Sequence, residues 1–367
     1  MNVLVLPRYS ALAASSRYRF HLYYPYLEAH GFRLTTQPLL GDAYMRQLYG
    51  RSAPGETFGK ADTLRAYRQR VSAIRGAKKA GHDLLWLQME ALPWVPGAAE
   101  VALLKSSGLP YVADYDDAWF HRYDAHPNPA VRATLGRKID AVMRHAALVV
   151  AGNEYIAARA RQAGARRVEL VPTVIDLDHY PLAPPPTGPP KERHFTIGWI
   201  GSPHSDQWLQ TIQPALARFC AEAPDARLVT VGASERIRAQ LPGVPLDLRP
   251  WTSATEVPEM QGFDVGIMPL TDSLWERGKC GFKLIQNLAC ARPVVASPVG
   301  VNAEIVRPGE NGFLAESQDE WVAALHRLRA DATPRQRMGE NGRRLVEERY
   351  ALQVTAPRTA ALLQSAT

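Results

Sequence analysis

Two lysines and a glutamine near residue 280 have the types and spacing of an anion-binding site. Lys279, Lys283 and Gln286 stand four and then three residues apart, so on a helix their side chains form one stripe. A helix start offers unpaired backbone N–H groups and a positive dipole end, and ammonium groups there strengthen the attraction for a diphosphate. The amide of Gln286 can donate to and accept from sugar hydroxyls. The alternative is a solvated basic helix face, the usual setting of isolated lysines.

The residues around this stripe favour the anion site. Gly278 and Gly281 free the backbone for close approach of a ligand, and Gly300 ends the next strand at the edge where α/β sheets bind ligands. Apolar residues at helical spacing follow Gly281 and face a core: Phe282, Leu284, Ile285, Leu288 and Ala289. The sequence therefore predicts a helix that leads from a phosphate site to a buried strand over 293–297.

Segment 276–302 resembles the nucleotide-sugar glycosyltransferases of family 4. LIQNLACARPVVASPVG, residues 284–300, is similar to the donor-helix signature of that family. GKCGFK, residues 278–283, is similar to a subgroup of bacterial enzymes that act on surface polysaccharides. The resemblance implies the GT-B fold, an α/β architecture of two Rossmann-like domains whose parallel sheets face each other across an interdomain cleft. It also implies that the anomeric configuration of the sugar is retained.

The chain departs from the family pattern at two acids. The paired glutamates of the family, eight residues apart, fall at Gly278 and Gln286. Ribose binding by Gln286 is compatible with this change, whereas the acid that recognises the donor sugar is missing. Glu276 could substitute if its loop folds back, and Arg277 and Val301 complete the donor-site residues predicted in this segment.

A second part of the predicted donor site follows the first strand of the C-terminal half. Gly201, Ser202 and His204 stand where relatives often place an arginine and then a lysine against the diphosphate, and both cations are absent here. Hydrogen bonds from Ser202, His204 and Ser205 would replace them, which leaves the two lysines as the main charges. Trp251 could border a uracil or guanine ring, although a core position is the default for tryptophan.

The N-terminal half carries the predicted acceptor side. AASSRYR, residues 13–19, follows the first strand where a loop leads into a helix, and it resembles the ASSR-type loop of the same bacterial subgroup. Arg17 is predicted to face the ligand, with Ser15, Ser16 and, farther along the chain, Glu90. The simpler interpretation makes Ser15 or Ser16 the cap of the helix.

Three aspartates end the fourth predicted strand in ADYDDAW, residues 113–119, at the edge where doubly wound sheets collect their sites. Asp116 and Asp117 are, with Lys283, the candidate catalytic residues. One of the aspartates could position the acceptor hydroxyl or cap the next helix. Relatives often carry a histidine that contacts the donor sugar at about this strand end, and Asp116 stands there. A divalent cation on these carboxylates is the weaker alternative, because the basic stripe already offsets diphosphate charge, and we predict no metal.

The elements that must position these residues alternate between short apolar runs and helical patterns, as in βαβ units. Strands are predicted in the first half at 3–6, 33–37, 84–88, 111–114, 148–151 and 168–171, and in the second half at 196–200, 227–231, 246–248, 264–268 and 294–297. Residues 1–180 are predicted to form a Rossmann-like acceptor domain, 181–194 a proline-rich linker and 195–349 a Rossmann-like donor domain. The resemblance implies that a last helix, about 350–367, packs back on the first domain.

Composition and charge narrow the class of protein. The 367 residues suffice for about two domains, and three cysteines at no metal-ligand spacing argue against a secreted disulfide framework. MNVLVLPRYS reads as a buried strand rather than a signal peptide, and no run reaches membrane-spanning length, so a cytoplasmic enzyme is expected. The net charge of +7 favours an anionic partner, and without a nucleic-acid motif a phosphorylated substrate or anionic lipid is favoured over nucleic acid.

Segment 59–79 is a candidate basic amphipathic helix. It holds one acid, Asp62, against the cations Lys60, Arg65, Arg68, Arg70, Arg75, Lys78 and Lys79. An apolar stripe at helical spacing lies beside them: Leu64, Tyr67, Val71 and Ile74. Two interpretations stay open: an ordinary surface helix, or peripheral attachment to anionic lipid on the inner face of a membrane, worth roughly 1 kcal/mol for each basic side chain.

Together these features predict a retaining, metal-independent glycosyltransferase without a cofactor, which moves a sugar from a UDP or GDP sugar to a hydroxyl acceptor in surface polysaccharide or glycolipid synthesis. No carboxylate nucleophile is evident, so catalysis would depend on stabilising the departing diphosphate and on near-attack geometry. Two alternatives stay open. One is a non-hydrolysing nucleotide-sugar epimerase, which needs acid–base residues, and the other is a non-catalytic nucleotide-sugar-binding subunit, prompted by the missing glutamates.

Overall fold

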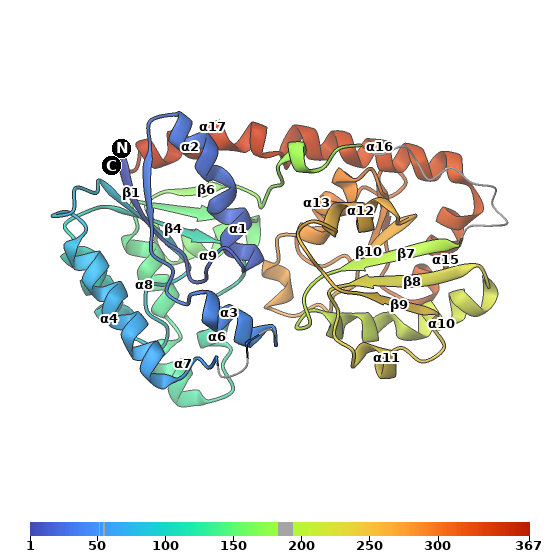
Figure 1. Ribbon diagram of the computed structural model, residues 1–367, viewed down its shortest axis with the longest axis horizontal. Coiled ribbons are helices and arrows are strands. Elements are labelled where there is room, and N and C mark those ends of the chain that lie inside the picture. Colours follow the sequence, from blue (N-terminus) through green and yellow to red (C-terminus); the bar gives the residue numbers. More distant parts are fainter. Residues whose placement is uncertain (51, 54–55, 183–193) are drawn as a thin grey trace. The chain divides into compact units, whose positions relative to one another are not determined.

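The computed structural model describes residues 1–50, 52–53, 56–182 and 194–367. Contacts divide the chain into two compact units (Figure 1): unit 1 comprises Met1–Val174, Gly278–Cys280 and Leu352–Thr367, and unit 2 comprises Ile175–Arg277 and Gly281–Ala351. Each unit holds one six-stranded sheet, and all the strand pairs are parallel. The predicted α/β class with two parallel-sheet domains is therefore confirmed. Most of the predicted linker, 183–193, lies outside the described residues, and the assignment of acceptor and donor domains stays a prediction.

The sheet of unit 1 has the order β2-β1-β3-β4-β5-β6. Its strands are β1 (Asn2–Leu6), β2 (Arg33–Thr36), β3 (Leu84–Gln88), β4 (Tyr111–Tyr115), β5 (Leu148–Ala151) and β6 (Val168–Leu170). All six predicted strands of the first half are confirmed, and β3, β4 and β5 are buried along their whole length, as expected for a parallel sheet covered on both faces. The strand order reverses between β1 and β3, which is where doubly wound sheets open a binding crevice.

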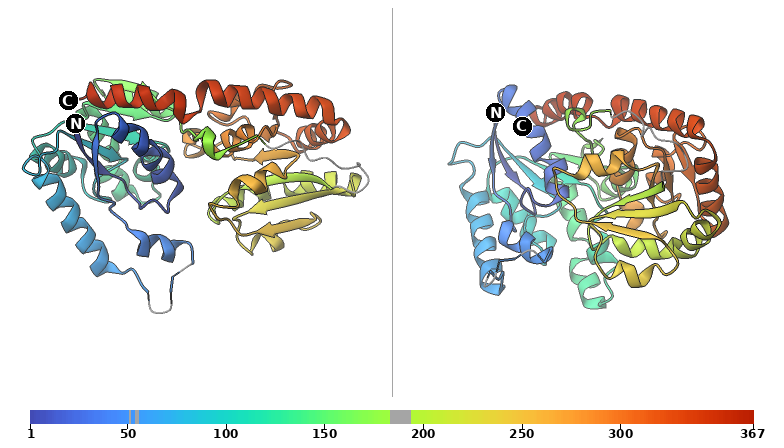
Figure 2. Two further views of the ribbon diagram at one scale, coloured as in Figure 1. Left: turned by 45° about the horizontal axis from the view of Figure 1, so that its top comes forward. Right: turned by 45° about the vertical axis from the view of Figure 1, so that its right-hand side comes forward.

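Helices cover this sheet (Figures 1 and 2). They are α1 (Ala14–Arg19), η1 (His21–Tyr23), α2 (Tyr24–Ala29), α3 (Asp42–Leu48), α4 (Lys60–Gly76), α5 (Gly97–Ser106), α6 (His121–Asp124), α7 (Pro129–Leu135), α8 (Lys138–His145), α9 (Glu154–Gln162) and α17 (Leu352–Gln364). The last of these, although it ends the chain, packs against η1 and α2 near the N-terminus. The Tyr23 hydroxyl lies 3.4 Å from the Thr355 hydroxyl in this contact.

Unit 2 has the sheet order β12-β11-β10-β7-β8-β9. Its strands are β7 (Phe195–Ile200), β8 (Ala226–Val231), β9 (Leu246–Arg249), β10 (Val265–Met268), β11 (Val294–Ala296) and β12 (Gly312–Leu314). The five predicted strands are confirmed. The strand β12 is not among the predicted strands, because its sequence GFL offers only two adjacent apolar side chains. The strand order reverses between β7 and β10, as in the dinucleotide-binding Rossmann sheet.

The helical segments of unit 2 include η2 (Leu177–His179), η3 (Asp206–Ile212), α10 (Gln213–Glu222), α11 (Ile237–Gln240), α12 (Glu256–Gln261), α13 (Phe282–Ala289), α14 (Asn302–Ile305), α15 (Gln318–Ala330) and α16 (Ala332–Arg349), and η4 (Glu276–Gly278) ends at the boundary with unit 1. The helix α13 approaches β10 closely, because Gly266 has no side chain. A Cβ at residue 266 would lie 2.2 Å from Cγ of Asn287, which is almost fully buried. This contact fixes the helix that carries Lys283 and Gln286.

The glycine contact predicts opposite effects of two Gly→Ala substitutions. Gly266→Ala must push α13 away from the sheet, so we expect a loss of about 1–3 kcal/mol in the free energy of unfolding. Gly76→Ala, at the end of α4, meets no atom within 4 Å, and we expect a gain of about 0.5–1 kcal/mol from reduced backbone entropy. Urea unfolding monitored by circular dichroism measures both, and equal effects of the two substitutions would contradict the close packing.

Candidate functional site

Unit 2 collects its predicted ligand residues at the carboxyl edge of the sheet, where the parallel strands end. They follow β7, β9, β10 and β11: Gly201, Ser202, His204, Trp251, Lys283, Gln286, Gly300 and Val301. The strand order also reverses at this sheet between β7 and β10. Topology therefore brings most of the predicted donor residues to the edge where sheets of this kind bind ligands.

The helix α13 presents Lys283 and Gln286 one turn apart. It starts at Phe282, after Gly281 in the left-handed conformation with φ of 65°. A Cβ at Gly281 would lie 2.4 Å from Cδ1 of Ile305, so both backbone angle and space require glycine. The half-buried Lys283 places Nζ 5.5 Å from the ring centroid of Trp199, a cation–π contact that holds the ammonium group near the end of β7.

Lys279 does not share this helix. It precedes α13 and belongs to unit 1, so the predicted stripe of Lys279, Lys283 and Gln286 is wrong. The ammonium group of Lys279 lies 3.6 Å from Asp117 Oδ1, and its side chain is 19% exposed. Asn153 Nδ2 donates to the carbonyl oxygens of Gly278 and Lys279 at 2.8 and 3.1 Å. Lys279 is thus anchored beside the carboxyl ends of β4 and β5.

The same packing accounts for the missing acid at residue 278. A Cβ at Gly278 would lie 2.3 Å from Cβ of Ala118 and 2.6 Å from its backbone nitrogen. The neighbouring thiol of Cys280 donates to the carbonyl oxygen of Asp116 at 3.0 Å, and it fills the space that a side chain at Gly152 would need. No glutamate fits at residue 278 while this segment keeps these contacts.

Gln286 is almost fully buried and donates through Nε2 to two acceptors. These are Glu256 Oε1 at 2.9 Å and the Tyr180 hydroxyl at 3.1 Å. The same carboxylate accepts from Tyr180 at 2.8 Å and from Trp251 Nε1 at 2.6 Å. Sequence reasoning missed Glu256 and Tyr180; the available signal was that Glu256 begins a helix shortly after β9, on the same edge as Gln286. The predicted contact between Trp251 and a nucleobase stays a prediction.

The loop after β7 is closed by its own side chains. The hydroxyl of Ser205 donates to the Ser202 carbonyl at 3.0 Å and accepts from the Ser202 N–H at 3.1 Å. A Cβ at Gly201 would lie 2.6 Å from the Trp199 ring, so the loop needs glycine there. These bonds favour a structural role for Ser205 over the predicted phosphate contact. The exposed His204 lies at the tip of this loop.

The side chains of Glu276 and Arg277 bind residues of their own loop. Arg277 is exposed, and its Nε lies 2.6 Å from Asp272 Oδ1. The buried carboxylate of Glu276 accepts a hydrogen bond from the Ser273 hydroxyl. Gly300, with φ of 54°, lets the backbone of Arg277 approach, since a Cβ would lie 2.5 Å from its carbonyl oxygen. The donor contacts predicted for Glu276, Arg277, Gly300 and the buried Val301 stay predictions.

In unit 1, α1 is capped differently from the prediction. Its N-cap is Ala13, without a side-chain hydrogen bond, so the interpretation of Ser15 or Ser16 as the cap is wrong. Ser16 is fully buried and donates to Gln88 Oε1 at 3.0 Å, which ties the helix to the end of β3. Arg17 is half-buried, and its Nη1 reaches the Ala11 carbonyl oxygen at 3.4 Å.

Arg19 and Arg70 of unit 1 are both buried and bind partners inside the fold. Arg19 forms an ion pair with Asp114 at 2.8 Å and donates to the Val171 carbonyl oxygen at 2.8 Å. Arg70, predicted on the basic face of α4, is fully buried and donates to Gln37 Oε1 and to backbone carbonyls of Leu6, Pro7 and Gln37. The prediction that Arg70 belongs to the basic face of this helix is therefore wrong. Burial, together with the charge of Arg8, lowers the pKa of Arg70 to about 9, below its usual range, although Glu100 opposes this shift.

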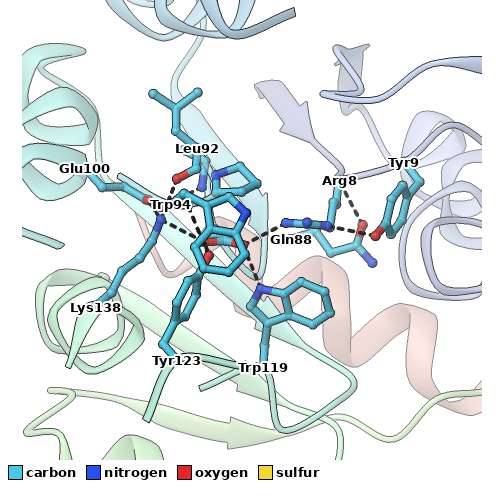
Figure 3. A network of polar contacts seen from close by, with 12 residues as sticks. Arg8, Tyr9, Gln88, Leu92, Trp94, Glu100, Trp119, Tyr123 and Lys138 are labelled. Carbon is cyan, nitrogen blue, oxygen red and sulfur yellow. Dashed lines mark hydrogen bonds and ion pairs between the residues drawn. The ribbon is translucent and has the colours of Figure 1, made fainter. Parts of the chain in front are cut away.

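Glu90 belongs to a buried polar network, and its partners Arg8, Trp119, Tyr123 and Lys138 are labelled in Figure 3. Its carboxylate is bound by four side chains at 2.7–2.8 Å: Arg8, Trp119, Tyr123 and Lys138. Burial opposes the charge of Glu90, but Lys138 and Arg8 still hold its pKa below the ordinary value. Lys138 also lies 2.7 Å from Glu100, so two cations balance two acids. Complete burial favours a structural role for Glu90 over the predicted acceptor contact.

Asp116 and Asp117 follow β4 and differ in their surroundings. Asp117 lies beside Lys279, whereas Asp116 Oδ1 is buried with no hydrogen-bond partner among the described residues. Burial, together with the charge of Asp117, raises the pKa of Asp116 to about 7. A carboxyl group with this pKa can exchange a proton near neutral pH, which suits an acid–base or hydroxyl-positioning role. The third aspartate, Asp114, accepts a hydrogen bond from Arg19 Nε at 2.8 Å.

Comparisons with known proteins find a family match for part of the chain and similar solved structures for nearly all of it. Residues 194–331 match the family described as "Glycosyl transferases group 1", and no curated protein matches the chain. HepE from Anabaena in complex with UDP matches with 16% identity over 100% of both chains and a TM-score of 0.70. Sucrose-phosphate synthase from Thermosynechococcus elongatus matches with 16% identity over 99% of this chain and 98% of that chain, with a TM-score of 0.74. A UDP-forming trehalose-phosphate synthase from Burkholderia xenovorans matches with 14% identity over 99% and 98%, with a TM-score of 0.64. These matches confirm the predicted GT-B fold class.

The raised pKa of Asp116 predicts a pH-dependent loss of stability. Below about pH 3 the group is protonated in both states and carries no cost. As the pH rises toward 7, the unfolded chain releases this proton while the folded chain keeps it, so stability is lost. Asp116→Asn removes this loss, and at pH 8 we expect the variant to be more stable than the parent by up to about 4 kcal/mol. At pH 4 the two should be nearly equal.

Urea unfolding of the parent and Asp116→Asn at several pH values between 4 and 8 measures this difference. Asp117→Asn serves as a second variant, because removal of its charge should lower the pKa of Asp116 and weaken the pH dependence. Parallel curves for the parent and Asp116→Asn would contradict the perturbed carboxyl group.

Proposed function

We propose that the chain is a glycosyltransferase of group 1 and that it transfers a sugar from a nucleoside diphosphate sugar, a UDP or GDP sugar, to a hydroxyl acceptor. The single observation that carries this proposal is the placement of Lys283 and Gln286 on α13, at the carboxyl edge of the sheet of unit 2. The positive end of this helix and one ammonium group suit a diphosphate, and the amide one turn deeper suits a sugar hydroxyl. Crystal structures of HepE contain UDP or UDP-glucose, which supports UDP as the first nucleotide to test.

In this proposal Lys283 acts on the leaving group. As the bond to the sugar breaks, negative charge develops on the diphosphate, and a fixed ammonium group stabilises that charge without reorganisation of solvent. The contact with Trp199 keeps the lysine in place before the nucleotide binds. Retention of configuration is a part of the proposal that follows from the family resemblance. Independence from metal is proposed because the ammonium group of Lys283 would offset diphosphate charge.

Unit 1 is proposed to bind the acceptor. Asp116 is the candidate that orients the acceptor hydroxyl or takes up its proton, because its pKa lies near 7. Asp117 and Lys279 form a charge pair beside it, and Ser15 and Arg17 from α1 complete the proposed acceptor side, while the buried Ser16 holds α1 against the end of β3. A role in surface polysaccharide or glycolipid synthesis is proposed from the resemblance of 278–283 to the bacterial subgroup.

We also propose that unit 1 attaches to an anionic membrane surface through α4. Exposed basic side chains lie along this helix and just after its last residue: Lys60, Arg65, Arg68, Arg75, Lys78 and Lys79. A groove of about 620 Å³ beside them is lined by Tyr67, Arg68, Val71, Ser72, Arg75, Gly76 and Leu92. Leu64 and Trp94 are exposed large hydrophobic side chains, at 53% and 47%. Attachment would be peripheral, as no described helix has the length and hydropathy needed to cross a bilayer.

The donor proposal predicts unequal effects of two substitutions on nucleotide affinity. Lys283→Ala removes the ammonium group and should weaken UDP or GDP binding by about tenfold or more, since a charged hydrogen bond contributes about 1.5–3 kcal/mol. His204→Ala, in the exposed loop after β7, should change the affinity less than threefold. Isothermal titration of both variants, with circular dichroism to confirm folding, measures the difference. Equal losses would contradict the assignment of Lys283, and absence of binding by the parent protein would contradict the donor proposal.

The membrane proposal predicts charge-dependent sedimentation with liposomes. The parent protein should sediment with vesicles rich in phosphatidylglycerol and remain in solution with phosphatidylcholine. Replacement of Arg68 and Arg75 by Gln should reduce binding by several-fold to about 30-fold, at roughly 1 kcal/mol for each charge. Arg337 and Arg349, exposed on α16 in unit 2, provide a control pair with the same change in net charge. Binding that is independent of anionic lipid, or equally reduced in both variants, would contradict the proposal.

A further inference from the structure

The contacts of Gln286 fix which of its atoms can face a ligand. An amide carries two N–H donors and one carbonyl acceptor. The acceptors at Nε2 are Glu256 Oε1 at 2.9 Å and the Tyr180 hydroxyl at 3.1 Å. The opposite orientation of the amide would place its carbonyl oxygen against the carboxylate of Glu256, and two oxygen acceptors repel each other at that distance. Glu256 therefore holds the amide in one orientation.

The carboxylate of Glu256 is itself fixed by donors from two other segments. Tyr180 donates to its Oε1 at 2.8 Å and Trp251 donates to its Oε2 at 2.6 Å. Glu256 is 7% exposed and Gln286 is 4% exposed, so a rearrangement would leave buried polar groups without partners. All four residues belong to unit 2.

We propose that Glu256 is a positioning residue that turns Gln286 into an obligate hydrogen-bond acceptor, and that this acceptor selects nucleotides that carry a ribose hydroxyl. This inference depends on the proposed function. The donors of Gln286 face Glu256 and Tyr180, so the carbonyl oxygen is the atom that can meet a ligand. A hydroxyl group donates to it, whereas a deoxyribose carbon does not. The glutamine thus presents an acceptor oxygen, as a carboxylate would, while the negative charge lies on Glu256.

The swap of the two residues gives the sharpest test. Glu256→Gln removes the fixed acceptor, so the amide of Gln286 can turn and its preference for a hydroxyl is lost. Gln286→Glu sets two carboxylates about 3 Å apart and should weaken nucleotide binding. The double variant, Glu256→Gln with Gln286→Glu, restores one carboxylate and one amide in exchanged positions, and residue 286 again presents only acceptors. Selectivity should therefore return in the double variant.

The measurement is the ratio of dissociation constants for 2′-deoxy- or 3′-deoxy-UDP and UDP, or for the GDP analogues if GDP is the nucleotide bound. We expect a ratio of about five to ten for at least one deoxy analogue with the parent protein, close to one for Glu256→Gln, and at least half of the parent value for the double variant. Glu259→Gln, the same change one turn along α12 at a residue paired with Arg249, is the matched control and should keep the parent ratio. Tyr180→Phe should lower the ratio partly, which gives a second test if Glu256→Gln does not fold.

The outcomes separate the two claims. A parent protein that binds neither UDP nor GDP contradicts the proposed function. A parent protein that binds UDP or GDP without any preference over both deoxy analogues contradicts the inference alone. Loss of selectivity in Glu256→Gln that the double variant does not restore also contradicts the inference, because it would show that Glu256 acts only on the stability of unit 2.

Discussion

The close approach of α13 to the sheet of unit 2 is the constraint on which the candidate donor site depends. Gly266 on β10 lets Asn287 reach the strand, and Gly281 starts the helix with a left-handed residue against Ile305. These two contacts fix both the depth and the starting point of the helix. Lys283 and Gln286 therefore lie at the carboxyl edge of the sheet. Their position depends on the packing of Asn287 against Gly266 on β10.

Charge in this chain is distributed differently from the pattern of the family it resembles. The position of one family glutamate is Gly278, and packing against Ala118 leaves no room for a side chain there. The position of the other is Gln286, and a carboxylate from α12, Glu256, lies against its amide. Negative charge thus remains near residue 286 although the acid is absent from α13. The loss of the acid at residue 286 is therefore not the loss of its negative charge, because the fold supplies a carboxylate from α12.

The sequence predicts the strands well and the polar contacts poorly, for physical reasons. Eleven strands are predicted because buried parallel strands are short apolar runs between helical patterns, whereas β12 offers only the adjacent pair Phe313 and Leu314. The predicted start of α13 is too early, because the spacing of Lys279 from Lys283 fits a helix. The left-handed conformation of Gly281, which ends the preceding loop and places the helix start at Phe282, is visible only in the structure. Arg70 was placed on the surface because arginine is usually exposed, and the carbonyl groups that bind it come from segments distant in the sequence. Glu256 and Gln286 are 30 residues apart, so their pairing appears only in the fold.

Hydrogen–deuterium exchange of the whole protein with and without UDP or GDP tests most directly whether the carboxyl edge of unit 2 binds a nucleotide. The backbone amides after β7 and at the start of α13, residues 201–205 and 282–286, should exchange more slowly when the nucleotide is bound, because the ligand covers the edge and stabilises the first helical turn. The segment 300–303 should be protected with them. Protection confined to other parts of the chain, or unchanged exchange under conditions where titration shows binding, would contradict this account.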